Sequence, residues 1–155
     1  IWLPRLDVAQ LIKHMPQSTV MMGVPTFYVR LLADKGFNKK VARNMRLFIS
    51  GSAPLLTETF NTFKEVIGQP ILERYGMSET IMLTSNPCKA SDGKRIGGTV
   101  GKPLPGVELR VVGDDGAALP AGEIGGIQVR GNLRVQSLLN PFCTSKASSG
   151  KFLVA

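Results

Sequence analysis

Two short polar stretches in this chain carry residue types that can bind a phosphorylated ligand. The first is Gly51-Ser52-Ala53-Pro54, which follows the apolar run of residues 46–51. Ligands of open α/β sheets bind at the carboxyl ends of strands, which is where this stretch is expected to lie. Its small residues would let a ring or a phosphate approach the backbone. The start of the helix expected to follow it would attract an anion. The alternative interpretation is a simple turn between a strand and a helix.

The second stretch, residues 74–79, follows the next apolar run. Tyr75 can stack on a purine, and Gly76 permits a tight turn. Ser78 can donate a hydrogen bond to a phosphate, and Glu79 can hold Mg²⁺, which prefers hard oxygen ligands. A solvated polar loop is the alternative, but two such stretches after successive strands favour a binding function.

Two arginines are candidates for pairing with an anionic ligand. Arg74 opens the second stretch, and its guanidinium can form a forked pair with a carboxylate. Arg30 lies on an expected helix, where a solvated arginine is the alternative. The glycine- and proline-rich residues 97–106 lack the lysine-ended pattern of a P-loop, so a rigid connection is favoured there. The one histidine, His14, is interpreted as structural or solvated.

The elements that must position these residues alternate along the first half of the chain. Asp7 is a candidate N-cap, Pro54 is expected at the start of a helix and Gly68 at its end. Apolar periodicity predicts helices at residues 7–15, 27–36 and 54–68, and strands at residues 18–24, 46–51 and 70–75. This order favours an α/β fold with a parallel sheet and crossover helices.

The second half of the chain has a different character. Strands are expected at residues 107–112 and 124–129, with a turn at residues 113–116. We therefore expect an α/β part at residues 1–100, a small β-rich part at residues 101–131, and a poorly ordered or foreign tail at residues 132–155.

Composition excludes several classes of function. The net charge of +8 suits phosphate-bearing ligands, but the charges are scattered and aromatic residues make up only 6% of the chain, which argues against a nucleic-acid partner. The two cysteines are far apart, so neither a disulfide framework nor a zinc site is expected. No apolar run reaches the roughly 18 residues of a membrane span. Without an initiator Met, the chain is interpreted as a piece of a longer protein.

The motifs together resemble a known enzyme superfamily. SGSAPL at residues 50–55, ERYGMSE at residues 73–79 and GTVGKPLPG at residues 98–106 resemble successive motifs of the adenylate-forming enzymes, which include acyl-CoA synthetases, luciferases and peptide-synthetase adenylation domains. The resemblance covers about residues 1–131. MGVPTFYVRLL, MRLFISGSAPLL and LERYGMSET resemble the malonyl-CoA and methylmalonyl-CoA synthetases in particular.

The resemblance implies a fold, a reaction and a substrate. The chain would be part of the large N-terminal region of an ATP-dependent acid–thiol ligase, which forms an acyl-adenylate and then transfers the acyl group to coenzyme A. By this resemblance Arg74 and Ser52 bind the distal carboxylate of malonate or methylmalonate, with Arg30 a weaker candidate. A buried second charge is costly unless it is paired, which agrees with an arginine there.

Roles in nucleotide binding also follow from the resemblance. Tyr75 would stack near the adenine of ATP, with Gly76 and Met77 in the same motif. Ser78, where threonine is usual, would contact phosphate, and Glu79 would bind Mg²⁺. Residues of the first motif would line the adenine pocket, namely Gly51, Ala53 and Pro54.

The departures from the family pattern concern catalysis. Three features of the family are not found: the upstream phosphate loop, the downstream ribose-binding Asp, and the lid with its catalytic Lys. No catalytic residue is therefore assigned. Because the missing domains are needed for activity, no turnover is expected. The resemblance is expected to end at Gly131. The alternative is a non-catalytic nucleotide- or partner-binding module from a truncated isoform. Eukaryotic relatives are typically mitochondrial, but no targeting segment is recognised, so the cytoplasm is the other candidate compartment.

Overall fold

The first half of the chain folds as alternating helices and strands. A computed structural model describes residues 1–3 and 5–131, and the backbone of residues 143–145. The elements of this half are α1 (Val8–His14), a 3₁₀ turn (Met15–Gln17), β1 (Val20–Gly23), α2 (Pro25–Leu32), β2 (Leu47–Ser50), α3 (Thr57–Ile67) and β3 (Leu72–Met77). All three predicted helices and all three predicted strands are present, with shifted ends.

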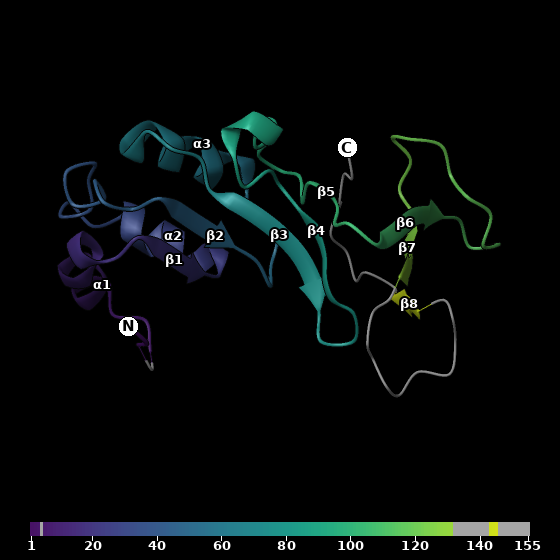
Figure 1. Ribbon diagram of the computed structural model, residues 1–155, viewed down its shortest axis with the longest axis horizontal. Coiled ribbons are helices and arrows are strands. Elements are labelled where there is room, and N and C mark those ends of the chain that lie inside the picture. The colour runs from purple at the N-terminus through teal and green to yellow at the C-terminus, as the bar shows by residue number, and fades with distance from the viewer. Residues whose placement is uncertain (4, 132–142, 146–155) are drawn as a thin grey trace.

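These strands form one sheet with two further strands. The order is β1-β2-β3-β4-β5, in which β4 is Ile81–Ser85 and β5 is Lys102–Pro103. The pairs β1–β2 and β2–β3 are parallel, as predicted, whereas β4 is antiparallel to both of its neighbours. Figure 1 shows β1 to β4 side by side, with the second sheet beyond the β3–β4 hairpin. Strands β4 and β5 are not predicted by the sequence pattern.

Helix ends follow the expected capping chemistry at two of three positions. Asp7 accepts a hydrogen bond from the backbone N–H of Gln10 at the start of α1. Gly68 ends α3 in the left-handed region, with φ 85°. The expected helix start at Pro54 is wrong, because α3 begins at Thr57. The N–H of Leu55 is bonded to the Glu73 side chain instead, so residues 51–56 form a loop.

The main core contains a group of packed aromatic rings and lies between the helices and one face of the sheet. Tyr28, Phe48 and Phe63 are fully buried. Phe63 makes edge-to-face contacts with Tyr28 and Phe48, at ring-centroid distances of 5.4 and 4.9 Å. The Tyr28 hydroxyl donates a 2.5 Å hydrogen bond to the Ile49 carbonyl. This core fixes α2 and α3 against β2, the strand that leads into the first motif.

The second sheet is antiparallel. It consists of β6 (Val107–Val112), β7 (Gly126–Gly131) and β8 (Cys143–Ser145), in that order. Leu83 of β4 forms a small buried cluster with Ile127 and Val129 of β7, so the two sheets share a core. Apart from β8, the predicted tail lies outside the described residues. Within residues 1–3 and 5–131, no helix is long and apolar enough to cross a membrane.

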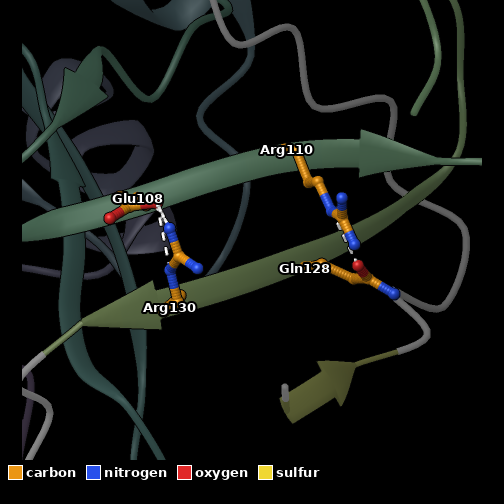
Figure 2. Close-up of polar contacts among 4 residues, drawn as sticks. All are labelled: Glu108, Arg110, Gln128 and Arg130. Carbon is orange, nitrogen blue, oxygen red and sulfur yellow. Dashed lines mark hydrogen bonds and ion pairs between the residues drawn. The ribbon is translucent and has the colours of Figure 1, made fainter. Parts of the chain in front are cut away.

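The outer face of the β6–β7 pair carries two polar cross-strand contacts, drawn in Figure 2. Arg130 forms an exposed ion pair with Glu108, and the Arg110 guanidinium donates a 2.9 Å hydrogen bond to Gln128. Alternating exposure along β6 agrees with the half-exposed strand that the sequence predicts.

Candidate functional site

A cavity of about 320 Å³ opens at the carboxyl ends of the parallel strands. It is lined by the end of β1, by the loop after β2, and by β3 and β4. Its lining contains Ser52 and Gly51 of the first motif and Arg74 and Gly76 of the second. The two motifs predicted to form one site therefore meet at one edge of the sheet, the usual position for a ligand in such folds.

Arg74 supplies the positive charge of this cavity. It is the only charged residue among the described residues that line the cavity. The side chain is half-buried, and its Nε atom is buried without a hydrogen-bond partner in the described part of the chain. Because an unpaired guanidinium nitrogen away from water is unfavourable, the arrangement suits an anionic ligand that accepts from it.

Ser52 lines the same cavity and has an unusual backbone conformation. Its φ is 65°, in the left-handed region that few residues other than glycine adopt. The side chain is exposed, so its hydroxyl is available to a ligand. Non-glycine residues held in this region are found preferentially at binding and active sites.

Glu73, for which the sequence predicts no role, is bonded to the loop that carries Ser52. Its side chain is 4% exposed, and its Oε1 accepts a 2.9 Å hydrogen bond from the Leu55 N–H. Burial raises the pKa of the Glu73 carboxyl, although the bond from Leu55 acts in the opposite direction. The one available signal was a glutamate inside an apolar strand, next to Arg74.

Tyr75 and Met77 lie away from this cavity. Both pack against the cluster of Leu83, Ile127 and Val129 that joins the two sheets. They belong to β3 together with Arg74, but successive strand residues point to opposite faces. Neither residue lines the cavity that contains Arg74 and Ser52. The second motif thus supplies residues to two separate environments.

Gly76 lies inside β3, so the predicted turn at this residue is wrong. Pairing with β4 shifts register between Tyr75 and Gly76. A Cβ atom at Gly76 would lie 2.2 Å from the carbonyl oxygen of Ile81, so the residue permits close contact between strands. The turn comes later, at residues 78–80, and is followed by Ile81 with φ 60°.

The remaining predicted site residues are exposed. Ser78 and Glu79 lie in the β3–β4 turn, and Ala53 and Pro54 lie in the loop beside Ser52. Arg30 is exposed on α2 and does not line the cavity. The structure therefore brings Ser52 and Arg74 together, but not Arg30.

The donor set for magnesium is small. Glu79 supplies a single carboxylate, and no group of three or more His, Cys, Asp or Glu side chains suited to a metal ion occurs in the described residues. Mg²⁺ is commonly held by one or two protein carboxylates and by phosphate oxygens. Glu79 fits that mode of binding, in which most ligands come from the nucleotide.

Arg95 and Asn86 stabilise the connection behind the site, and neither was predicted. Arg95 donates to the carbonyl oxygens of Pro70, Pro87 and Cys88 at 2.7 to 2.9 Å. Asn86 is buried and donates from its side-chain amide to the Thr99 carbonyl at 2.7 Å. The Asn86 backbone N–H donates to the Glu73 carbonyl. These contacts fix the start of β3 against the residue 86–99 connection.

Comparison with known proteins agrees with the predicted superfamily. The family described as AMP-binding enzyme matches residues 3–137, which extends past the expected limit at Gly131. The chain is 42% identical over 114 residues to the malonate–CoA ligase of Arabidopsis thaliana, covering 68% of this chain and 18% of that protein. It is 40% identical over 111 residues to the mitochondrial malonate–CoA ligase ACSF3 of Bos taurus, covering 64% of this chain and 18% of that protein.

A solved structure supports the same assignment. ATP-bound MatB from Rhodopseudomonas palustris is 50% identical, with a TM-score of 0.80 over 84% of this chain and 25% of that chain. The chain spans about a fifth of the length of these two curated relatives, since it covers 18% of each. The predicted α/β fold with a parallel sheet and a small β-rich part is confirmed. The chain belongs to the family of AMP-binding, adenylate-forming enzymes and is malonyl-CoA synthetase-like.

Proposed function

We propose that this chain supplies the carboxylate-binding part and some of the nucleotide-binding part of a malonate–CoA ligase. The relatives named as malonate–CoA ligases support the substrate class. The ATP-bound relative supports the use of ATP. Methylmalonate is included as a substrate because it differs from malonate only by a methyl group on the carbon between the carboxylates.

The observation that carries this proposal is the presence of Arg74 and Ser52 in one cavity. Malonate has two carboxylates, of which one reacts and the other must be desolvated. A desolvated carboxylate costs several kcal/mol unless it is paired. The buried, unpaired Nε of Arg74 offers that pairing, and the Ser52 hydroxyl adds a hydrogen bond.

In the proposed reaction the free carboxylate of malonate attacks the α-phosphate of ATP, forming malonyl-adenylate and releasing pyrophosphate. The thiolate of coenzyme A then attacks the malonyl carbonyl and displaces AMP. Arg74 and Ser52 hold the distal carboxylate and thereby direct the other one toward the phosphate. Arg74 and Ser52 thus orient the malonyl group in both steps.

The nucleotide would lie along the same edge of the sheet. We assign the exposed loop residues Ala53 and Pro54, with Gly51, to the adenine side, and Ser78 to a phosphate. Tyr75 is assigned to adenine through the superfamily motif alone, since its ring packs toward the second sheet. Mg²⁺ neutralises phosphate charge when bound, and Glu79 is the residue that would hold it.

The experiment that tests this proposal is isothermal titration of the folded chain with a non-hydrolysable malonyl-adenylate analogue. Micromolar binding is expected, and Arg74→Ala should weaken it at least about 30-fold, since removing one member of a buried charge pair costs about 2 kcal/mol or more. Arg43→Ala removes an exposed arginine of the segment between α2 and β2, so it should bind like the wild type.

Equal affinity in the Arg74→Ala variant would contradict the assignment. No binding by a folded wild-type chain would favour the alternative of a partner-binding module. Mitochondrial residence is proposed from the Bos taurus relative, and fractionation of cells that express the natural protein would test it.

A further inference from the structure

The Glu73 carboxyl joins the two segments that form the candidate site. Glu73 lies on β3, immediately before Arg74, and is 4% exposed. Its Oε1 accepts the hydrogen bond of the Leu55 N–H, in the loop between β2 and α3. The loop that carries Ser52 is therefore linked to the strand that carries Arg74.

Both ends of this loop are fixed against the same residue. At its start, Ser50 of β2 is the parallel-sheet partner of Glu73. At its end, Leu55 donates to the Glu73 carboxyl at 2.9 Å. Between them, Ser52 has φ 65°, a conformation that persists only where surrounding structure imposes it.

Leu55 also has an apolar contact that is independent of the hydrogen bond. Its side chain is 3% exposed and belongs to the main core with Phe60 and Phe63. The packing of the Leu55 side chain in the core holds this end of the loop in place. The hydrogen bond of the Leu55 N–H to Glu73 orients its backbone. A substitution at Glu73 can therefore remove the second constraint and leave the first in place.

We propose that Glu73 is a positioning residue that holds Ser52 opposite Arg74 by fixing the loop of residues 51–55 through the Leu55 N–H. Glu73 is not among the residues that line the cavity, so it acts through Leu55 and not by touching the ligand. The inference deepens the proposed function and rests on it, because Ser52 and Arg74 are the pair assigned to the distal carboxylate.

The experiment compares Glu73→Gln, which keeps a carbonyl oxygen as acceptor, with Glu73→Met, which has similar length and no such acceptor. Amide hydrogen exchange of the full chain, followed by NMR without ligand, reports on the Leu55 N–H. Titration with the malonyl-adenylate analogue reports on the site. Circular dichroism establishes that each variant is folded.

We expect Leu55 to be protected in the wild type and in Glu73→Gln, and to exchange rapidly in Glu73→Met. Analogue affinity should fall about tenfold in Glu73→Met, because a small misplacement of a binding group is costly, and should be retained in Glu73→Gln. Unchanged Leu55 protection in Glu73→Met, or wild-type affinity in that folded variant, would overturn the proposal.

Two other outcomes are also decisive. If Glu73→Met does not fold, the proposal is tested with the wild type and Glu73→Gln. Exchange of the Leu55 amide hydrogen at the rate of an open loop amide in either chain would overturn the proposal. If the wild type does not bind the analogue while Leu55 protection follows the acceptor, the loop constraint is supported and the proposed function fails.

Discussion

Arg74 and Tyr75 are adjacent on β3 but lie in different environments. Arg74 lines the cavity that contains Ser52, whereas Tyr75 packs against the cluster of Leu83, Ile127 and Val129. Strand alternation causes this separation, since successive side chains point to opposite faces. One short motif thus supplies both the charged residue of the cavity and a contact between the two sheets, so substitutions at the two positions should have different consequences.

Selectivity for the distal carboxylate should depend on Arg74. We expect Arg74→Ala to weaken binding of a malonyl-adenylate analogue at least about 30-fold. Binding of a propionyl-adenylate analogue should change only a few-fold, because that analogue lacks the distal carboxylate that Arg74 is proposed to bind. Isothermal titration of both analogues measures this. An equal loss for both would mean that Arg74 does not bind the distal carboxylate.

Ser52 should show opposite effects on stability and binding. Ser52→Gly removes the hydroxyl and relieves the positive φ, so the chain should unfold at an equal or higher temperature while the analogue binds more weakly. Ser52→Ala is the control, because it removes the hydroxyl and keeps the unfavourable φ. Thermal unfolding and titration of both variants measure the two effects. Lower stability of the glycine variant than of the alanine variant would contradict the interpretation.

The features that the sequence predicted correctly depend on local chemistry. Asp7 and Gly68 cap their helices through groups within a few residues of themselves. Ser52 follows β2 and Arg74 lies inside β3, and although both line one cavity, their roles in binding stay predictions. Glu73 could not be found in this way. Its partner, Leu55, lies 18 positions away, and nothing in either segment indicates that contact.

Long-range contacts also explain the incorrect predictions. The turn rule for Gly76 failed because that glycine accommodates the Ile81 backbone of a neighbouring strand. The helix rule for Pro54 failed because Glu73 binds the Leu55 N–H and α3 begins only at Thr57. Strand β4 was missed because its apolar run is only three residues long, Ile81–Leu83, and its antiparallel pairing with β3 is a contact that this short run does not indicate.

Gly76 should be intolerant of even one methyl group. Its Cβ would lie 2.2 Å from the Ile81 carbonyl oxygen, in rigid backbone, so Gly76→Ala should lower the free energy of unfolding by about 2 kcal/mol or more. Gly126→Ala in β7 is the matched control, because its Cβ would make only an ordinary 3.7 Å contact with Val112. Urea unfolding of both variants tests this, and equal stability would show that β4 moves away without cost.

The Glu73 carboxyl should make stability fall as pH rises. Burial raises the pKa of the Glu73 carboxyl in the folded state above its unfolded value of about 4.3. The contribution of this raised pKa to the stability of the fold is therefore complete below about pH 4.3 and is lost as the pH rises through the folded-state pKa. Glu73→Gln keeps an acceptor and cannot ionise. Urea unfolding should therefore show that, as the pH rises from 4 to 7, the stability of the variant increases relative to that of the wild type. A difference independent of pH would contradict the raised pKa.

Two arginines should differ sharply in their effect on stability. Arg95 is partly buried and donates to three backbone carbonyls, so Arg95→Ala should cost about 2 kcal/mol or more by leaving those oxygens without their partner. Arg130 pairs with Glu108 in an exposed contact (Figure 2), with side chains 61% and 68% exposed, so Arg130→Ala should change stability by less than about 1 kcal/mol. Urea unfolding at low and moderate salt measures both. A larger loss for Arg130→Ala would show that the exposed cross-strand pair, and not the Arg95 contacts, is the stronger constraint on the fold.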